Sequence, residues 1–303
     1  DQRVMGQVST RRLRVVKYRG SGYGPNEHPC VITDRGIELL PVSAVRLEQG
    51  LGPPVSCGHE ALDRILGGGF RQGSSVLISG ASGTGKTTLL CTFARGACQR
   101  GEKTLQVSFE ESRATLLSGM ESVGIDLQPH LDDRSLHLET IMPESMGAES
   151  HLVYLLRVLD RVEPAHLLVD AISACRRVGS PQASYELLMR LSNEARRRGI
   201  TVLFSNQLVH GGAMAGLSGV GVSSLLDALV TLRLADDGAE LRRVLTVMKS
   251  RGMNHARQHH RFRITGSGIE VLGPCAARTR SAVDLEQTRE VDVHPPGEGE
   301  PGS

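Results

Sequence analysis

Apolar and polar positions are arranged in two ways along this chain, and each arrangement predicts a different element. Between continuous apolar runs, apolar residues recur at helical spacing, which favours amphipathic helices. Apolar strands that alternate with helices indicate a mostly parallel sheet covered on both faces, so we predict an α/β fold that ends in a β-rich C-terminal segment. The predicted strands are 74–80, 104–110, 136–141, 165–170 and 200–207, and the predicted helices are 86–100, one from Ser112, one around 151–162 and 182–198.

An internal repeat is the second pattern. VVKYRGSGYG (15–24) returns as VMKSRGMNHA (247–256), and ITDRGIELLP (32–41) returns as ITGSGIEVLGP (264–274). Every matched pair is offset by 232 residues without a gap, from Arg11 and Arg243 onward, which indicates a duplicated unit. We expect two strands in each copy, one running into Lys-x-Arg-Gly and one ending in a glycine turn.

The repeat also sets the expected domain organisation. Since residues 1–45 match only the end of the later unit, we expect them to be the C-terminal end of a truncated first unit. Residues 46–56 are the expected linker, rich in Gly and Pro, and 57–275 the complete unit. The Pro-, Gly- and charge-rich tail 276–303 is expected to be disordered. The chain begins with Asp1 instead of Met, so we expect a fragment.

A phosphate-binding loop is predicted at GASGTGKTT (80–88), which fits G-x-x-x-x-G-K-[ST] between a predicted strand and helix. Backbone N–H groups of such a loop surround phosphates at a helix N-terminus. Lys86 is expected to neutralise the β- and γ-phosphates, and Thr87 to hold Mg²⁺.

Carboxylates end two of the predicted strands. Asp170 is expected to assist Mg²⁺ through water. Glu110 and Glu111 lie at the edge where open α/β sheets bind ligands, and can activate an attacking water or hydroxyl. The alternative for this acidic pair is a helix N-terminus enriched in acids, since both residues lie near Ser112 and suit the helix dipole.

Two further pairs of residues have open interpretations. Lys249 and Arg251 occupy alternate positions, which in a strand places both on one face and suits phosphate; a solvated strand face is the alternative. Ser223 and Ser224 follow the glycine-rich stretch 210–222. By spacing alone, Ser224 with Asp227 fits a helix-capping box.

Together these segments resemble the RecA-superfamily ATPases, and within them the KaiC circadian-clock family. The resemblance runs from about residue 11 to 272, and its elements are HEALDRILGGGF (59–70), GASGTGKTT, FEESRATLL, LLVDAISA, the Lys-x-Arg-Gly repeat and ITGSGIEVL. It implies two tandem RecA-like lobes, of which this chain has the end of the first and all of the second. It also implies hexamers with ATP and Mg²⁺ at the subunit interfaces.

The resemblance implies roles for individual residues. The implied cofactor-binding residues are Ser82, Gly83, Thr84, Gly85, Lys86, Thr87, Thr88, Asp170, Arg243, Lys249 and Arg251. Thr87 and Glu110 are implied near Mg²⁺, and Glu110 and Glu111 match the paired catalytic glutamates, which act with Lys86. Arg243, Lys249 and Arg251 are expected to reach the neighbouring subunit's nucleotide. Ser223 and Ser224 match the adjacent autophosphorylated Ser and Thr, which favours acceptors over caps.

Some positions depart from the family pattern. Val123 stands where cyanobacterial members have an aromatic residue that stacks on adenine. Ser218 aligns with a Thr of the acceptor loop, upstream of the adjacent pair. The resemblance allows a KaiB-type partner. A KaiA-type partner is not favoured, because the sequence after Leu272 has no visible similarity to the segment that binds KaiA.

Composition and net charge disfavour some of the remaining candidate functions. The net charge is +2, Trp is absent, and the stretch 210–222 has no Lys, Arg or aromatic residue, which disfavours nucleic-acid binding. Six dispersed cysteines, no signal peptide and no apolar run of membrane-spanning length predict a cytoplasmic protein. The sequence therefore predicts an ATP-hydrolysing Ser/Thr autokinase that acts as a phosphorylation switch in a clock or signalling system. The alternatives are a RecA-like DNA-handling ATPase and an ATP-gated oligomeric scaffold without significant kinase activity.

Overall fold

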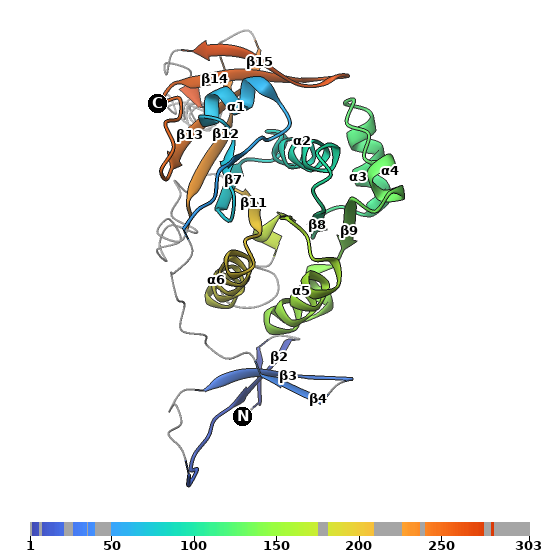
Figure 1. The fold of residues 1–303 in the computed structure, drawn as a ribbon, viewed down its shortest axis with the longest axis vertical. Coiled ribbons are helices and arrows are strands. Elements are labelled where there is room, and N and C mark those ends of the chain that lie inside the picture. Colours follow the sequence, from blue (N-terminus) through green and yellow to red (C-terminus); the bar gives the residue numbers. More distant parts are fainter. Residues whose placement is uncertain are drawn as a thin grey trace, which may run out of the picture.

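The computed structural model describes residues 2–5, 8–20, 27–34, 36–39, 50–174, 181–208, 226–236, 240–275 and 280–281. Within these residues the central sheet has ten strands in the order β15-β14-β13-β12-β7-β11-β10-β8-β9, with β16 paired to β12 (Figure 1). Its strands are β7 (Ser75–Gly80), β8 (Thr104–Ser108), β9 (Leu136–Thr140), β10 (His166–Asp170), β11 (Thr201–Gln207), β12 (Ala228–Asp236), β13 (Leu241–Ser250), β14 (His259–Thr265), β15 (Gly268–Cys275) and β16 (Arg280–Ser281).

Helices cover both faces of this sheet. One core cluster joins α1 (Glu60–Leu66), α2 (Lys86–Gln99) and α3 (Arg113–Glu121) to one face. A second cluster joins α5 (Ala148–Val162) and α6 (Pro181–Arg197) to the opposite face, as Figure 1 shows. The remaining short elements are β5 (Pro54–Val55), β6 (Phe70–Arg71), α4 (Gln128–Asp132) and the 3-10 turn η1 (Pro143–Ser145). None of the described helices would span a bilayer.

The direction of the strands confirms the predicted fold class. The neighbours β12, β7, β11, β10, β8 and β9 are parallel, whereas β12 to β15 run antiparallel and form the β-rich C-terminal part. The five predicted apolar strands and the four predicted helices are all present, with ends shifted by a few residues.

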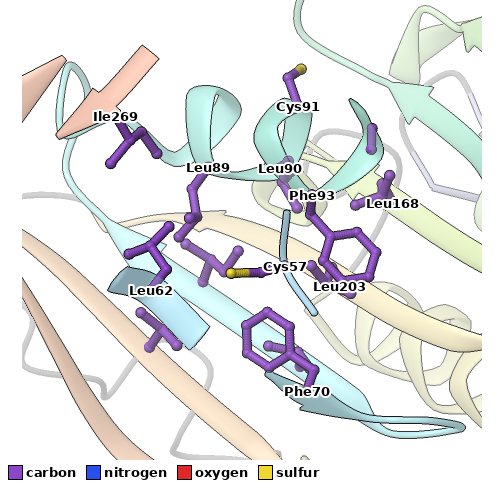
Figure 2. Packing of buried hydrophobic residues seen from close by; sticks show 14 of the residues in the cluster. Cys57, Leu62, Phe70, Leu89, Leu90, Cys91, Phe93, Leu168, Leu203 and Ile269 are labelled. Atoms are coloured by element: carbon purple, nitrogen blue, oxygen red, sulfur yellow. The ribbon is translucent and has the colours of Figure 1, made fainter. Parts of the chain in front are cut away.

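Helix α2 lies at the centre of the first core cluster, and its position brings its N-terminus to the end of β7. Figure 2 shows Leu89, Leu90 and Phe93 of α2 pointing toward Leu62 and Phe70. Phe93 is fully buried and its ring centroid lies 6.1 Å from that of Phe70. Burial of such a side chain stabilises the fold by about 1.5–3 kcal/mol, so this packing firmly fixes the helix that begins at Lys86.

The two copies of the repeat each form a three-stranded antiparallel meander. The second copy is β13 to β15; the first is β2 (Val8–Leu13), β3 (His28–Thr33) and β4 (Gly36–Leu39), in a separate sheet that also contains β1 (Gln2–Met5). The prediction of two strands per copy was therefore wrong. Gly36 and Gly268, both at φ +102°, lie at the expected glycine turn, and each begins a third strand that the sequence had not indicated.

Strand β3 of the small sheet contacts α5, and the small sheet lies on the side of α5 in Figure 1. The guanidinium of Arg157 donates to Thr33 Oγ1 at 2.9 Å and to Glu38, and lies 3.4 Å from Asp34. Val31 packs against the second core cluster. Of the predicted tail, Arg280 and Ser281 are described, as β16; its other residues lie outside the described part.

Candidate nucleotide-binding site

The loop between β7 and α2 is shaped by glycines. Gly83 has φ +74° and Gly85 φ +98°, left-handed conformations that an L side chain rarely adopts. A Cβ on Gly80 would lie 2.5 Å from the carbonyl oxygen of Leu232, so the loop can leave β7 only as glycine. The loop therefore runs directly into the N-terminus of α2, and the backbone N–H groups of a helix N-terminus are suited to bind phosphate.

Lys86 is the first residue of α2 and is folded back over this loop. Its Nζ donates to the carbonyl oxygen of Ala81 at 2.8 Å, and Thr84 Oγ1 donates to the same oxygen at 2.8 Å. Burial lowers the pKa of the Lys86 ammonium, and the negative charges of Asp170 and Glu110 oppose that shift. The ammonium is thus positioned to exchange a loop carbonyl for phosphate oxygens.

Thr87 and Asp170 meet beside the loop. Thr87 Oγ1 donates to Asp170 Oδ2 at 2.7 Å, and Ser205 Oγ donates to Asp170 Oδ1. Asp170 ends β10 and Ser205 lies near the end of β11, so parallel strand ends bring the three together. The described residues contain no group of three or more His, Cys, Asp or Glu that could hold a metal alone. A hydroxyl, one carboxylate and substrate phosphates are instead typical of Mg²⁺ sites.

Glu110 and Glu111 follow β8 and precede α3. The Ser108 hydroxyl receives the N–H of Glu111 at 3.1 Å and donates to its carbonyl at 3.0 Å, which fixes the turn. Burial raises the pKa of Glu111, and the charges of Asp170 and Glu110 raise it further. The helix that follows begins at Arg113 with Ser112 as its N-cap and has no acidic residue in its first turn. Glu110 and Glu111 therefore lie just before the N-cap, next to the helix N-terminus, which agrees with the alternative that they suit the helix dipole.

Two residues at this edge had not been singled out from the sequence. Asn206 and Gln207 end β11 beside Ser79 and Gly80 of β7. Asn206 is 4 % exposed, and its Oδ1 has no hydrogen-bond partner within the part of the chain that the structure describes. Their place at the end of the predicted strand 200–207 was the available signal, because ligands bind at the carboxyl ends of such strands.

The three cations predicted to act together occupy two ends of β13. Arg243 pairs with Leu234 near the phosphate-binding loop, and its Nε donates to the carbonyl of Gly83 at 3.2 Å. Lys249 pairs with Leu229, six residues further along β13, which corresponds to about 20 Å. Arg251 lies just past the strand. Lys249 and Arg251 are therefore at the opposite edge of the sheet from their own loop.

The other predicted residues are placed as follows. Ser82 and Gly83 are exposed at the tip of the loop, Thr88 is buried beneath it, and Val123 is half-buried against the first core cluster. Ser218, Ser223 and Ser224 lie outside the described residues. Residues 228–236, which follow them, form the strand β12, so the helix-cap alternative for Ser224 was wrong.

A phosphate-binding loop between a parallel strand and a helix, on a mostly parallel sheet covered on both faces, defines a RecA-like P-loop ATPase fold. The family model for the KaiC ATPase matches residues 55–275, and the chain belongs to the KaiC family.

Named relatives agree with this family. The chain is similar to circadian clock protein KaiC2 of Synechocystis sp., at 35 % identity over 276 residues, covering 90 % of this chain and 48 % of the relative. It is similar to circadian clock oscillator protein KaiC of Synechococcus elongatus, at 32 % identity over 267 residues, covering 88 % of this chain and 51 % of the relative. The chain thus spans about half the length of the curated relatives it matches.

Proposed function

We propose that this chain binds ATP with Mg²⁺ at its P-loop, hydrolyses it, and transfers the γ-phosphoryl group to Ser223 or Ser224. In this proposal the chains form a hexamer with ATP at each interface, and phosphorylation is a switch in a clock or signalling system. The observation that carries this proposal is that groups suited to a magnesium nucleotide lie at two opposite edges of one sheet. Thr87 and Asp170 lie at one edge, and Lys249 and Arg251 lie at the other. The names of the relatives, circadian clock proteins, support the clock part of the proposal.

The residues at the P-loop edge fit a magnesium nucleotide. The Thr87 hydroxyl and the Asp170 carboxylate are hard oxygen donors 2.7 Å apart, which suit Mg²⁺. Mg²⁺ bound beside them would neutralise charge on the β- and γ-phosphates. Lys86 would leave the Ala81 carbonyl to bind phosphate oxygens, and the N–H groups at the start of α2 would hold the rest of the triphosphate chain.

Glu110 and Glu111 are the proposed acceptors of the proton that the attacking water or hydroxyl loses. Either a water or a serine hydroxyl attacks the γ-phosphorus, the bond to the β–γ bridging oxygen breaks, and ADP leaves. The proton of the attacking oxygen goes to Glu110 or Glu111. Burial raises the pKa of Glu111 toward neutral pH, and a carboxylate is a better general base as its pKa approaches the working pH.

The cations at the far edge supply the argument for a second copy. Lys249 and Arg251 lie about 20 Å along β13 from the end that contacts their own P-loop, so they cannot serve it. An Arg fork beside a Lys is suited to phosphate. In a ring of identical chains, this edge would face the P-loop edge of the next chain, and each nucleotide would receive both sets of groups.

The test is incubation of the purified chain with ATP labelled at the γ-phosphate, followed by mass spectrometry of the segment 209–225. We expect label on Ser223 or Ser224, and none after both are changed to Ala, with hydrolysis retained. Label that persists in the double Ala variant would contradict the assigned acceptors. Hydrolysis and assembly without any label would favour the ATP-gated scaffold, and salt-sensitive binding to single-stranded DNA would favour the DNA-handling alternative.

A further inference from the structure

Asp227 is a buried carboxylate just before β12, on the edge of the sheet that carries Lys249 and Arg251. Its Oδ2 accepts the N–H of Ser75 at 2.9 Å and a hydrogen bond from Arg196 at the end of α6. Its Oδ1 lies 3.8 Å from Nη1 of Arg251. One acidic side chain therefore joins the sheet, a helix and a cation proposed to act on the next subunit.

The two arginines at Asp227 are held differently. The side chain of Arg196 is 21 % exposed and hydrogen-bonded to the carboxylate, whereas that of Arg251 is 49 % exposed and, at 3.8 Å, beyond hydrogen-bond distance of it. Lys249 lies close by, and burial together with the charge of Arg251 lowers its pKa. Arg196 neutralises Asp227 at close range, so Arg251 is oriented by the carboxylate without being bound tightly to it.

Main-chain contacts tie the same residues together. The N–H of Arg251 donates to the carbonyl of Asp227 at 2.8 Å, and Lys249 Nζ donates to the carbonyl of Leu226 at 2.7 Å. Next to these contacts, the pairing of β12 with β13 shifts register between Leu229 and Val230, which leaves Met248 as an extra residue. Such a bulge changes the direction of the side chains that follow it. The end of β13 is thus aimed by the bulge and anchored on residues 226 and 227.

We propose that Asp227, held by Arg196, is a positioning residue that orients Arg251 and Lys249 toward the nucleotide of the neighbouring copy. This inference rests on the proposed function above. A packing role alone does not require charge here, because a buried ion pair is commonly replaced by apolar residues without loss of stability.

The experiment measures ATP hydrolysis by the full chain and variants. Asp227→Asn and Arg196→Gln are each expected to lower kcat about tenfold, the effect of losing one charge-assisted contact, while KM changes less than twofold. Arg196→Lys should recover most of the activity. The matched control is Arg197→Gln, because Arg197 lies next to Arg196 on α6 but is exposed and pairs with Glu194. It should hydrolyse ATP at the wild-type rate.

Mixed assemblies separate positioning from folding. The partner chain carries Glu110→Gln and Glu111→Gln, so it lacks the proposed base but keeps its cations. Mixed with Asp227→Asn chains, it should restore hydrolysis at their P-loops several-fold above either variant alone. If Asp227→Asn fails to fold, Arg196→Gln takes its place in the mixture. A variant that folds, loses activity and is not restored in mixtures would overturn the inference.

One comparison distinguishes failure of the inference from failure of the proposed function. If Lys249→Ala with Arg251→Ala leaves hydrolysis unchanged, the cations do not act across an interface, and the proposed function is wrong at that point. If that double change removes hydrolysis while Asp227→Asn and Arg196→Gln behave as wild type, only the positioning role is wrong.

Discussion

The last two strands of each repeat copy form the same hairpin, β3–β4 in the first copy and β14–β15 in the second. The two hairpins differ in how far their apolar side chains are buried. Thr265 Oγ1 donates to the Gly268 carbonyl at 3.1 Å in the second copy, and Thr33 Oγ1 donates to the Gly36 carbonyl at 3.4 Å in the first. Yet Ile269 is 7 % exposed and Ile37, its counterpart, 62 %. The local sequence is sufficient for the turn, but not for burial.

What differs is the layer above the hairpin. Ile269 lies beside α2 in Figure 2, and a Cβ on Gly85 of the P-loop would come within 2.9 Å of Cδ1 of Ile264. The second hairpin therefore packs directly against the nucleotide site. Among the described residues no such layer covers Ile37 or Ile32. Ile32, the counterpart of Ile264, is 59 % exposed, although Val31 of β3 packs against the second core cluster. The second copy packs against the candidate nucleotide site, whereas the first copy has the same backbone shape without that contact.

The largest difference between the copies should be catalytic. Lys249→Ala with Arg251→Ala removes two cations proposed to stabilise the transferring phosphoryl group, and we expect ATP hydrolysis to fall about 10³-fold, the usual effect of losing an arginine finger. The matched change, Lys17→Ala with Arg19→Ala, should leave the rate within twofold, since those exposed residues follow β2 of the separate small sheet. Comparable losses in both double variants would contradict the assignment of the catalytic cations to the second copy alone.

The next effect is on stability. Ile269→Ala leaves a cavity in the first core cluster and should lower the free energy of unfolding by about 3 kcal/mol. Ile37→Ala removes atoms that are already in contact with water and should change it by less than about 0.5 kcal/mol. Denaturant unfolding monitored by circular dichroism measures both. Equal losses would mean that the first hairpin is covered in solution.

A smaller effect concerns how the first sheet is held. Arg157 of α5 contacts Thr33, Asp34 and Glu38, so Arg157→Ala should speed amide hydrogen exchange in β3 and β4. Arg161→Ala is the control, because Arg161 lies on the same helix but pairs with Glu139 of β9. Exchange in β14 and β15 should be unaffected by either change. If Arg157→Ala leaves β3 and β4 as slow as before, the apolar contact of Val31 with the core is sufficient to hold the sheet.

The sequence predicted most of the P-loop edge because those signals are local. The apolar runs, the motif at 80–88 and the acids at strand ends each report on their own segment, and parallel pairing then brings the ends together. The sequence did not predict the separation of Arg243 from Lys249 and Arg251, since this depends on how β13 pairs with β12 and on the bulge at Met248. The capping-box pattern at Ser224 misled for the same reason: pairing of β12 with β7 and β13 outweighs a local helix signal.

The smallest expected effect tests the one acidic residue that the aligned copies share. Glu270 and its counterpart Glu38 both pair with arginine, but Arg263 is in the same hairpin and Arg157 is on α5. Arg263 lowers the pKa of Glu270 below its ordinary 4.5, so this pair contributes stability above that pH, and the contribution is lost as the pH falls through the lowered pKa. In Arg263→Ala, NMR titration should show the pKa of Glu270 returning toward 4.5. Arg242→Ala is the control. It removes the ion pair between Arg242 of β13 and Glu240, and it should leave the pKa of Glu270 unchanged. A pKa that stays low without Arg263 would show that the surrounding sheet, and not the hairpin's own pair, sets the charge of this glutamate.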